Sequence, residues 1–144
     1  MEHFLGTWKL DKKKSEGLAN ILKVLKYKTI ERKAILNTKL MIDVQYDHND
    51  KIVTIKTITR FKDLLKVHFL DNESRVITDD NGTITHEKCY FTKDKDGICV
   101  ETHYLEEKIH VTDKRTIKDG NIVQEIKAIV DGKETHVAKM VYHR

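Results

Sequence analysis

Apolar and polar residues alternate with a period of two along most of the chain after residue 40. In the segment 108–118 every even position is polar or charged, whereas Ile109, Val111 and Ile117 lie on the opposite face. Successive side chains of a β-strand point to opposite faces of a sheet, so this pattern predicts strands with one face in water. Turn-forming clusters separate the segments roughly every ten to fifteen residues, which predicts antiparallel strands joined by hairpins. These clusters are residues 47–50, 70–73, 79–82, 93–97, 105–107, 118–121 and 130–133.

The segment 15–36 departs from this alternation and predicts helix. Ser15 is suited to cap the start of the helix, and Glu16 follows in the first turn. The predicted order is one strand, a helical stretch and then about nine strands. The apolar residues that follow helical spacing are Leu18, Ile21, Leu22 and Leu25.

Two charged residues, Asp113 and Arg115, interrupt the apolar face of the segment 108–118. A guanidinium on such a face must be paired or solvated, because burying it alone costs several kcal/mol. A carboxylate ligand can accept paired, charge-assisted hydrogen bonds from Arg115. Alternatively, Arg115 pairs with Asp113, about 6–7 Å along the same face, or it lies exposed at a bulge.

Length and charge limit the classes of function. The 144 residues fit one domain, 1–144, and the net charge of +4 is too mild to predict nucleic-acid binding. The sequence shows no signal peptide or membrane span, which predicts a cytoplasmic protein with Cys89 and Cys99 as free thiols. The eight histidines have no metal-ligand spacing. We therefore expect no metal, no cofactor and no enzyme activity.

The motifs of the whole chain, taken together, resemble the intracellular lipid-binding proteins, a family that includes the fatty-acid-binding proteins and the cellular retinoid-binding proteins. The matching motifs are GTWKL near the start, SE before the helices, then ERKA, TIKT, FKD and a terminal VY. The resemblance implies a mainly β fold: a ten-stranded, up-and-down antiparallel β-barrel capped by a helix-turn-helix between the first two strands. It also implies a monomer that holds one long-chain fatty acid or related lipid in a water-filled interior.

The resemblance further implies a set of ligand-binding residues. In family members that bind fatty acids, two arginines and a tyrosine commonly hold the carboxylate. Arg115 and Tyr142 match one arginine and the tyrosine, while Met140 replaces the second arginine. His103 aligns near a polar interior position, and Phe61 matches a phenylalanine beside the portal through which the ligand passes. The full predicted set is Arg115, Tyr142, Met140, Asp113, His103, Phe61 and Thr57, the last supplying a hydroxyl to interior water.

Because Met140 replaces a cation, the sequence does not decide whether the head group of the ligand is charged or neutral. The protein binds either a fatty acid through Arg115 and Tyr142, or a neutral-headed lipid such as an alcohol, an ester or a retinoid. The basic helical segment also allows transient contact with anionic membranes. The residues expected there are Lys23, Lys26, Lys28 and Lys33. A structural protein that uses these lysines to associate with membranes is the alternative function.

Overall fold

The computed structural model describes residues 1–78, 82–93 and 96–144, and within these ranges the chain forms ten β-strands and two α-helices. The expected turns at 79–82 and 93–97 lie partly outside the described residues. The strands are β1 (Gly6–Glu16), β2 (Met41–Asp47), β3 (Ile52–Ile58), β4 (Asp63–Phe69), β5 (Arg75–Thr78), β6 (Ile84–Phe91), β7 (Gly97–Tyr104), β8 (Ile109–Lys118), β9 (Asn121–Val130) and β10 (Glu134–His143). A short 3-10 helix, Glu2–Phe4, precedes them.

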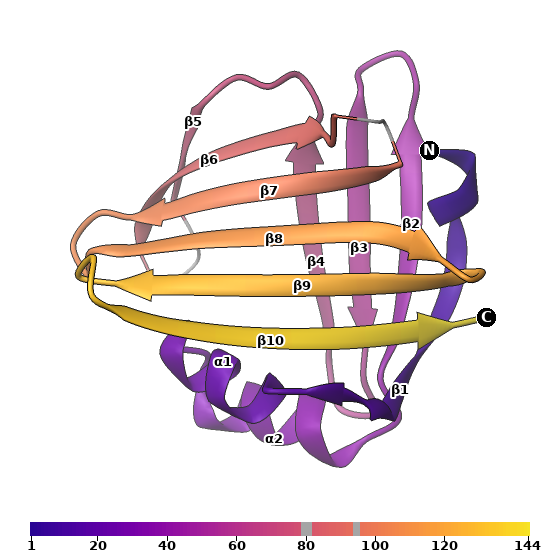
Figure 1. Ribbon diagram of the computed structural model, residues 1–144, viewed down its shortest axis with the longest axis horizontal. Helices are drawn as coiled ribbons and strands as arrows, with labels where there is room; N and C mark the ends of the chain where they lie inside the picture. The colour runs from indigo at the N-terminus through magenta and orange to yellow at the C-terminus, as the bar shows by residue number, and fades with distance from the viewer. Residues whose placement is uncertain (79–81, 94–95) are drawn as a thin grey trace.

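All the paired strands are antiparallel and form one sheet in the order β4-β3-β2-β1-β10-β9-β8-β7-β6-β5. The sheet curls on itself, so that β7 to β10 cross in front of β2 to β4 (Figure 1). Strands that follow one another in the sequence are neighbours in the sheet, except β4 and β5, which form its two edges; in addition, β10 pairs with β1. The predicted up-and-down architecture is therefore confirmed.

The helices α1 (Leu18–Val24) and α2 (Thr29–Asn37) lie together at one end of the curled sheet (Figure 1). The expected cap at Ser15 is wrong. Strand β1 continues to Glu16, and the Ser15 hydroxyl accepts a hydrogen bond from the Val141 N–H at 3.1 Å. Gly17, with φ of 78°, takes the N-cap position before α1 instead. The break between the helices falls at Lys26, whose φ of 60° ends the first helix without a glycine.

The edge strands β4 and β5 are not paired with each other. Polar contacts bridge this seam instead. The His68 ring on β4 contacts the carboxylate of Glu87 on β6, and the Asn72 N–H donates to the Cys89 carbonyl at 3.0 Å. The curled sheet is thus held shut by side chains and a loop rather than by a strand ladder.

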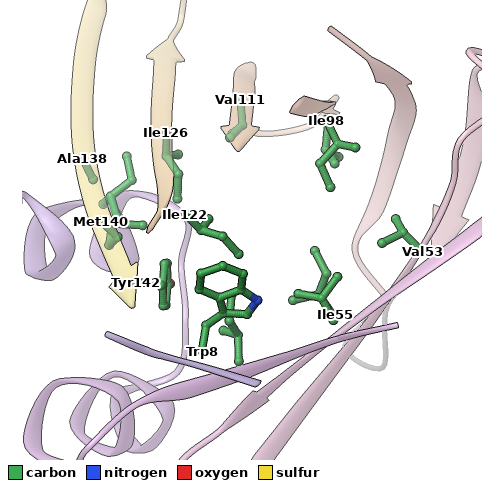
Figure 2. Packing of buried hydrophobic residues seen from close by; sticks show 14 of the residues in the cluster. Trp8, Val53, Ile55, Ile98, Val111, Ile122, Ile126, Ala138, Met140 and Tyr142 are labelled. Atoms are coloured by element: carbon green, nitrogen blue, oxygen red, sulfur yellow. The ribbon is translucent and has the colours of Figure 1, made fainter. Parts of the chain in front are cut away.

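The apolar core lines the concave face of the sheet. Figure 2 shows side chains from β1, β3 and β7 to β10 directed toward a common interior, with Trp8 among them. Inward threonines such as Thr57 and Thr102 are only partly buried. Side chains on the concave face that remain accessible indicate that the core does not fill the interior.

The two cysteines lie on neighbouring strands but on opposite faces. Cys89 pairs in register with Val100, whereas Cys99 pairs with Tyr90. Both are buried and free, and burial raises the pKa of the Cys89 thiol to about 12. Because their side chains leave the sheet in opposite directions, they cannot form a disulfide without rearranging the strands.

Candidate ligand-binding site

Asp113 and Arg115 both point into the interior from β8. They share a face with the buried residues Ile109 and Val111, as the alternation predicts. Arg115 Nε lies 3.6 Å from Asp113 Oδ1, and the Arg115 side chain is only 13 % exposed. The exposed position considered for Arg115 is thus excluded, and pairing with Asp113 is present.

A hydrogen-bond chain links this ion pair to Tyr142. The Tyr142 hydroxyl donates to Gln124 Oε1 at 3.0 Å, and Gln124 Nε2 donates to Asp113 Oδ1 and Oδ2 at 3.1 and 3.0 Å. Burial raises the pKa of Tyr142 to about 12, while Arg115 acts in the opposite direction. The phenol is therefore neutral near pH 7 and serves as a donor.

Gln124 is a site residue that the sequence pattern signals but that the motifs did not single out. It is a polar residue on the otherwise apolar even face of β9, between Ile122 and Ile126. That is the pattern that drew attention to Asp113 and Arg115 on β8. In register, Gln124 lies between Arg115 on β8 and Met140 on β10.

One nitrogen of Arg115 has no hydrogen-bond partner in the described part of the chain. Nη1 is buried and unpartnered, while Nε faces Asp113. A buried donor without an acceptor costs about 1–3 kcal/mol. An oxygen ligand that reaches this nitrogen would remove that cost, so the cluster of Asp113, Arg115, Gln124 and Tyr142 is suited to the polar end of a guest molecule.

Met140 and Thr57 both face the interior. Met140 is 2 % exposed and belongs to the apolar core around Trp8, as Figure 2 shows. Its thioether cannot donate a hydrogen bond, so this wall offers an apolar surface beside Gln124. Thr57 lies on β3 in register with Ile42 and Leu64, and its side chain is partly buried.

The expected interior position of His103 is wrong. His103 pairs in register with His110, which lies on the face of β8 opposite to Ile109 and Val111. The two imidazole rings stack on the outer surface with centroids 3.9 Å apart. Partial burial and the neighbouring His110 lower the pKa of His103. Both rings border an open pocket of about 320 Å³, which Ile109 and Ile129 also line and Arg115 does not.

Phe61 does not reach the interior either. It lies in the turn between β3 and β4 with its side chain 69 % exposed. Within this turn the Thr59 hydroxyl donates to the Lys62 carbonyl at 2.6 Å, which holds the loop closed. The expected contact of Phe61 with a ligand beside the portal stays a prediction.

Lys66 is an interior cation that the alternating pattern did not predict. On β4 it pairs in register with the buried Ile55, so both side chains face inward. Its Nζ lies 5.7 Å from the ring centre of Tyr27, which connects α1 and α2. Tyr27 raises the pKa of Lys66, burial lowers it, and Tyr104 and Asp113 raise it further. Because Tyr104 and Asp113 lie on β7 and β8, Lys66 faces the opposite wall of the interior (Figure 1).

The sequence pattern of β4 does not indicate that Lys66 faces the interior, because the apolar residues of this strand face outward. The apolar residues Leu65, Val67 and Phe69 are exposed on the outer face, whereas Lys66 and His68 point inward. In an alternating strand, the apolar residues are normally predicted to face the core and the polar residues between them to face solvent. The register with β3, in which Lys66 pairs with Ile55 and His68 with Val53, shows which side chains of β4 face inward.

The four lysines of the helical segment are all exposed to solvent. Lys23 is on α1, Lys33 is on α2, and Lys26 and Lys28 lie between the helices or at the start of α2. Among the described residues, no helix has the length and apolar character needed to cross a membrane.

Gly97 fixes the spacing of β7 and β8 beside Arg115. A Cβ on Gly97 would lie 2.3 Å from the Arg115 carbonyl oxygen and 2.8 Å from Thr116 Cγ2. Gly97→Ala must therefore push β8 away, and we expect a loss of roughly 1–3 kcal/mol in the free energy of unfolding. Urea unfolding measures this loss. Unchanged stability would show that β8 is free to move, and the position of Arg115 would then not depend on Gly97.

Three solved structures with this fold match over essentially their full length. Lipid binding protein 8 of Caenorhabditis elegans, in its apo form, has a TM-score of 0.79 and 17 % identity, covering 100 % of this chain and 96 % of that one. Fatty-acid-binding protein 1 of Echinococcus granulosus has a TM-score of 0.71 and 21 % identity, covering 100 % and 98 %. The fatty acid binding protein of Schistosoma mansoni, in complex with arachidonic acid, has a TM-score of 0.71 and 19 % identity, covering 100 % and 97 %.

This chain therefore has the fold of the intracellular lipid-binding proteins, as the motifs predicted. At these identities the likeness establishes the fold and leaves the ligand open. No protein-family model matches the sequence, and no curated protein matches it either.

Proposed function

We propose that this protein binds a long-chain fatty acid or a similar hydrophobic ligand inside its curled sheet and carries it through the cytoplasm. The observation that carries the proposal is the cluster of Asp113, Arg115, Gln124 and Tyr142 within an otherwise apolar concave wall, with Arg115 Nη1 left without a partner. Burying such a group is costly unless a bound polar group compensates it. The proposed role is that of a binding protein and not of an enzyme.

Three further observations support the proposal. Interior threonines remain partly accessible, which leaves room among the apolar residues. The matching solved structures include a fatty acid binding protein in complex with arachidonic acid. The apolar wall around Met140 suits a hydrocarbon chain, while the ion pair on β8 suits its polar end.

Trp8 provides a direct test, because it is the single tryptophan of the chain and lies on the interior wall. Titration with oleic acid should change its fluorescence and saturate at one molecule per chain. Calorimetry should give the same stoichiometry. A chain that binds neither oleic acid nor methyl oleate would refute the proposal.

Contact with anionic membranes is a second candidate activity. Ile30 on α2 is 74 % exposed, and the exposed residues Lys28 and Lys33 lie close to it in sequence. An apolar side chain flanked by cations is suited to the surface of an anionic bilayer. We expect co-sedimentation with phosphatidylserine vesicles that weakens at high salt. Clustering of vesicles without uptake of oleic acid would favour a structural membrane role over ligand transport.

A further inference from the structure

The interior cation Lys66 differs from the charged side chains around it because no carboxylate of the described residues lies within ion-pair distance of it. In the described ranges, β4 to β8 direct six acidic or basic side chains inward: Lys66, His68, Arg75, Glu87, Asp113 and Arg115. His68 contacts Glu87, Arg75 pairs with Asp71, and Arg115 pairs with Asp113. Among the ion pairs of the described residues, none includes Lys66.

The surroundings of Lys66 keep it cationic within the interior. Its side chain remains accessible to solvent, yet it faces Tyr27 at the helical cap and the wall formed by β7 and β8. The Tyr27 ring centre lies 5.7 Å from Nζ, and this side chain offers a π-face and a hydroxyl but no carboxylate. An ammonium group that faces the concave wall without a carboxylate beside it favours an anionic partner.

The Arg115 charge, in contrast, is already balanced. Asp113 lies 3.6 Å from Arg115 Nε and accepts two hydrogen bonds from Gln124. A neutral guest would leave Lys66 as the one basic group among these six, in the described strands, that contacts no carboxylate. One monoanionic guest would balance it.

We propose that the ligand is an acidic lipid with a single negative charge, a fatty carboxylate, and that Lys66 supplies the cation for its head group. This inference rests on the proposed function, and it selects the acid over the alcohol, ester or retinoid that Met140 left open. Lys66 on β4 thus supplies the positive charge that Met140 does not provide, and it does so from the opposite wall of the interior. Arg115 remains necessary because it neutralises Asp113 through Nε and offers its unpartnered Nη1 as a donor to the same head group.

The test compares oleic acid with methyl oleate, which has the same chain but no charge. Lys66→Met should weaken binding of oleic acid by about tenfold, because a charge-assisted interaction is lost. Binding of methyl oleate should change by less than about threefold, since the methionine side chain keeps the apolar part of the lysine. Lys66→Arg, which keeps the charge, should bind oleic acid nearly as the wild type does.

Lys88→Met is the matched control. Lys88 on β6 also lies over a tyrosine, with Nζ 5.8 Å from the ring centre of Tyr90, but it points outward, since the adjacent Cys89 is buried on the inner side. It should leave both ligands unaffected. Equal losses for the acid and the ester in Lys66→Met, or no loss for either, would overturn the role of Lys66 while leaving ligand binding intact. If the wild type binds neither ligand, the proposed function fails as well.

Discussion

Arg115→Ala is expected to weaken binding of oleic acid by roughly 10- to 100-fold, because a charge-assisted hydrogen bond contributes about 1.5–3 kcal/mol. The effect should exceed that of Lys66→Met, since removal of the guanidinium also leaves the carboxylate of Asp113 uncompensated in the interior. Methyl oleate should lose less than about threefold, because it presents no charge to Asp113. Calorimetric titration of both ligands measures the difference.

Two variants make the result for Arg115 interpretable. Lys114→Ala removes a neighbouring cation that points outward, and it should leave both affinities unchanged. Arg115→Ala combined with Asp113→Asn removes both charges of the pair, and it should recover part of the affinity for oleic acid. Equal losses of acid and ester in Arg115→Ala would show that Arg115 shapes the interior without contributing to the head-group site.

Trp8→Ala is expected to lower the free energy of unfolding by about 3–5 kcal/mol, the usual cost of removing a large buried aromatic residue. Trp8 is 2 % exposed, and its Nε1 donates to the Phe4 carbonyl at 2.9 Å. The Arg144 guanidinium lies 4.1 Å from the ring centre, so the side chain also ties the C-terminus to β1. Urea unfolding followed by circular dichroism measures the loss without relying on tryptophan fluorescence.

Trp8→Phe serves as the control, because it keeps an aromatic ring but removes the indole N–H. Its loss should be clearly smaller than that of Trp8→Ala. A change of less than about 1 kcal/mol in Trp8→Ala would contradict the description of Trp8 as a tightly packed core residue.

The alternating pattern was enough to predict most of the sheet. The even polar face and odd apolar face of β8 appear in the structure as outer and inner faces, with Asp113 and Arg115 directed inward. The expected turns at 47–50, 70–73, 105–107, 118–121 and 130–133 coincide with connections between strands. These features depend on the spacing of residues close together in the chain, which can be read directly from the sequence.

The candidate site was less predictable because it depends on register and on long-range contacts. The alternating pattern does not predict Lys66 as an interior residue, because the apolar residues Leu65, Val67 and Phe69 of β4 face outward and the pairing with Ile55 places Lys66 inward. His103 was misplaced for the opposite reason, because the resemblance suggested its position and the register with His110 reversed it. Ser15 has the chemistry of a helix cap but bonds to the Val141 N–H on β10 instead.

Mass spectrometry of the lipids that co-purify with the protein under native conditions tests the central claim most directly. We predict one fatty acid per chain, with a free carboxylate and a long hydrocarbon tail, and its loss from preparations of Arg115→Ala. A chain that retains only a neutral lipid would contradict the head-group site at Lys66 and Arg115. A chain that retains no lipid, and takes up none when oleic acid is supplied, would contradict ligand binding as the function of this fold.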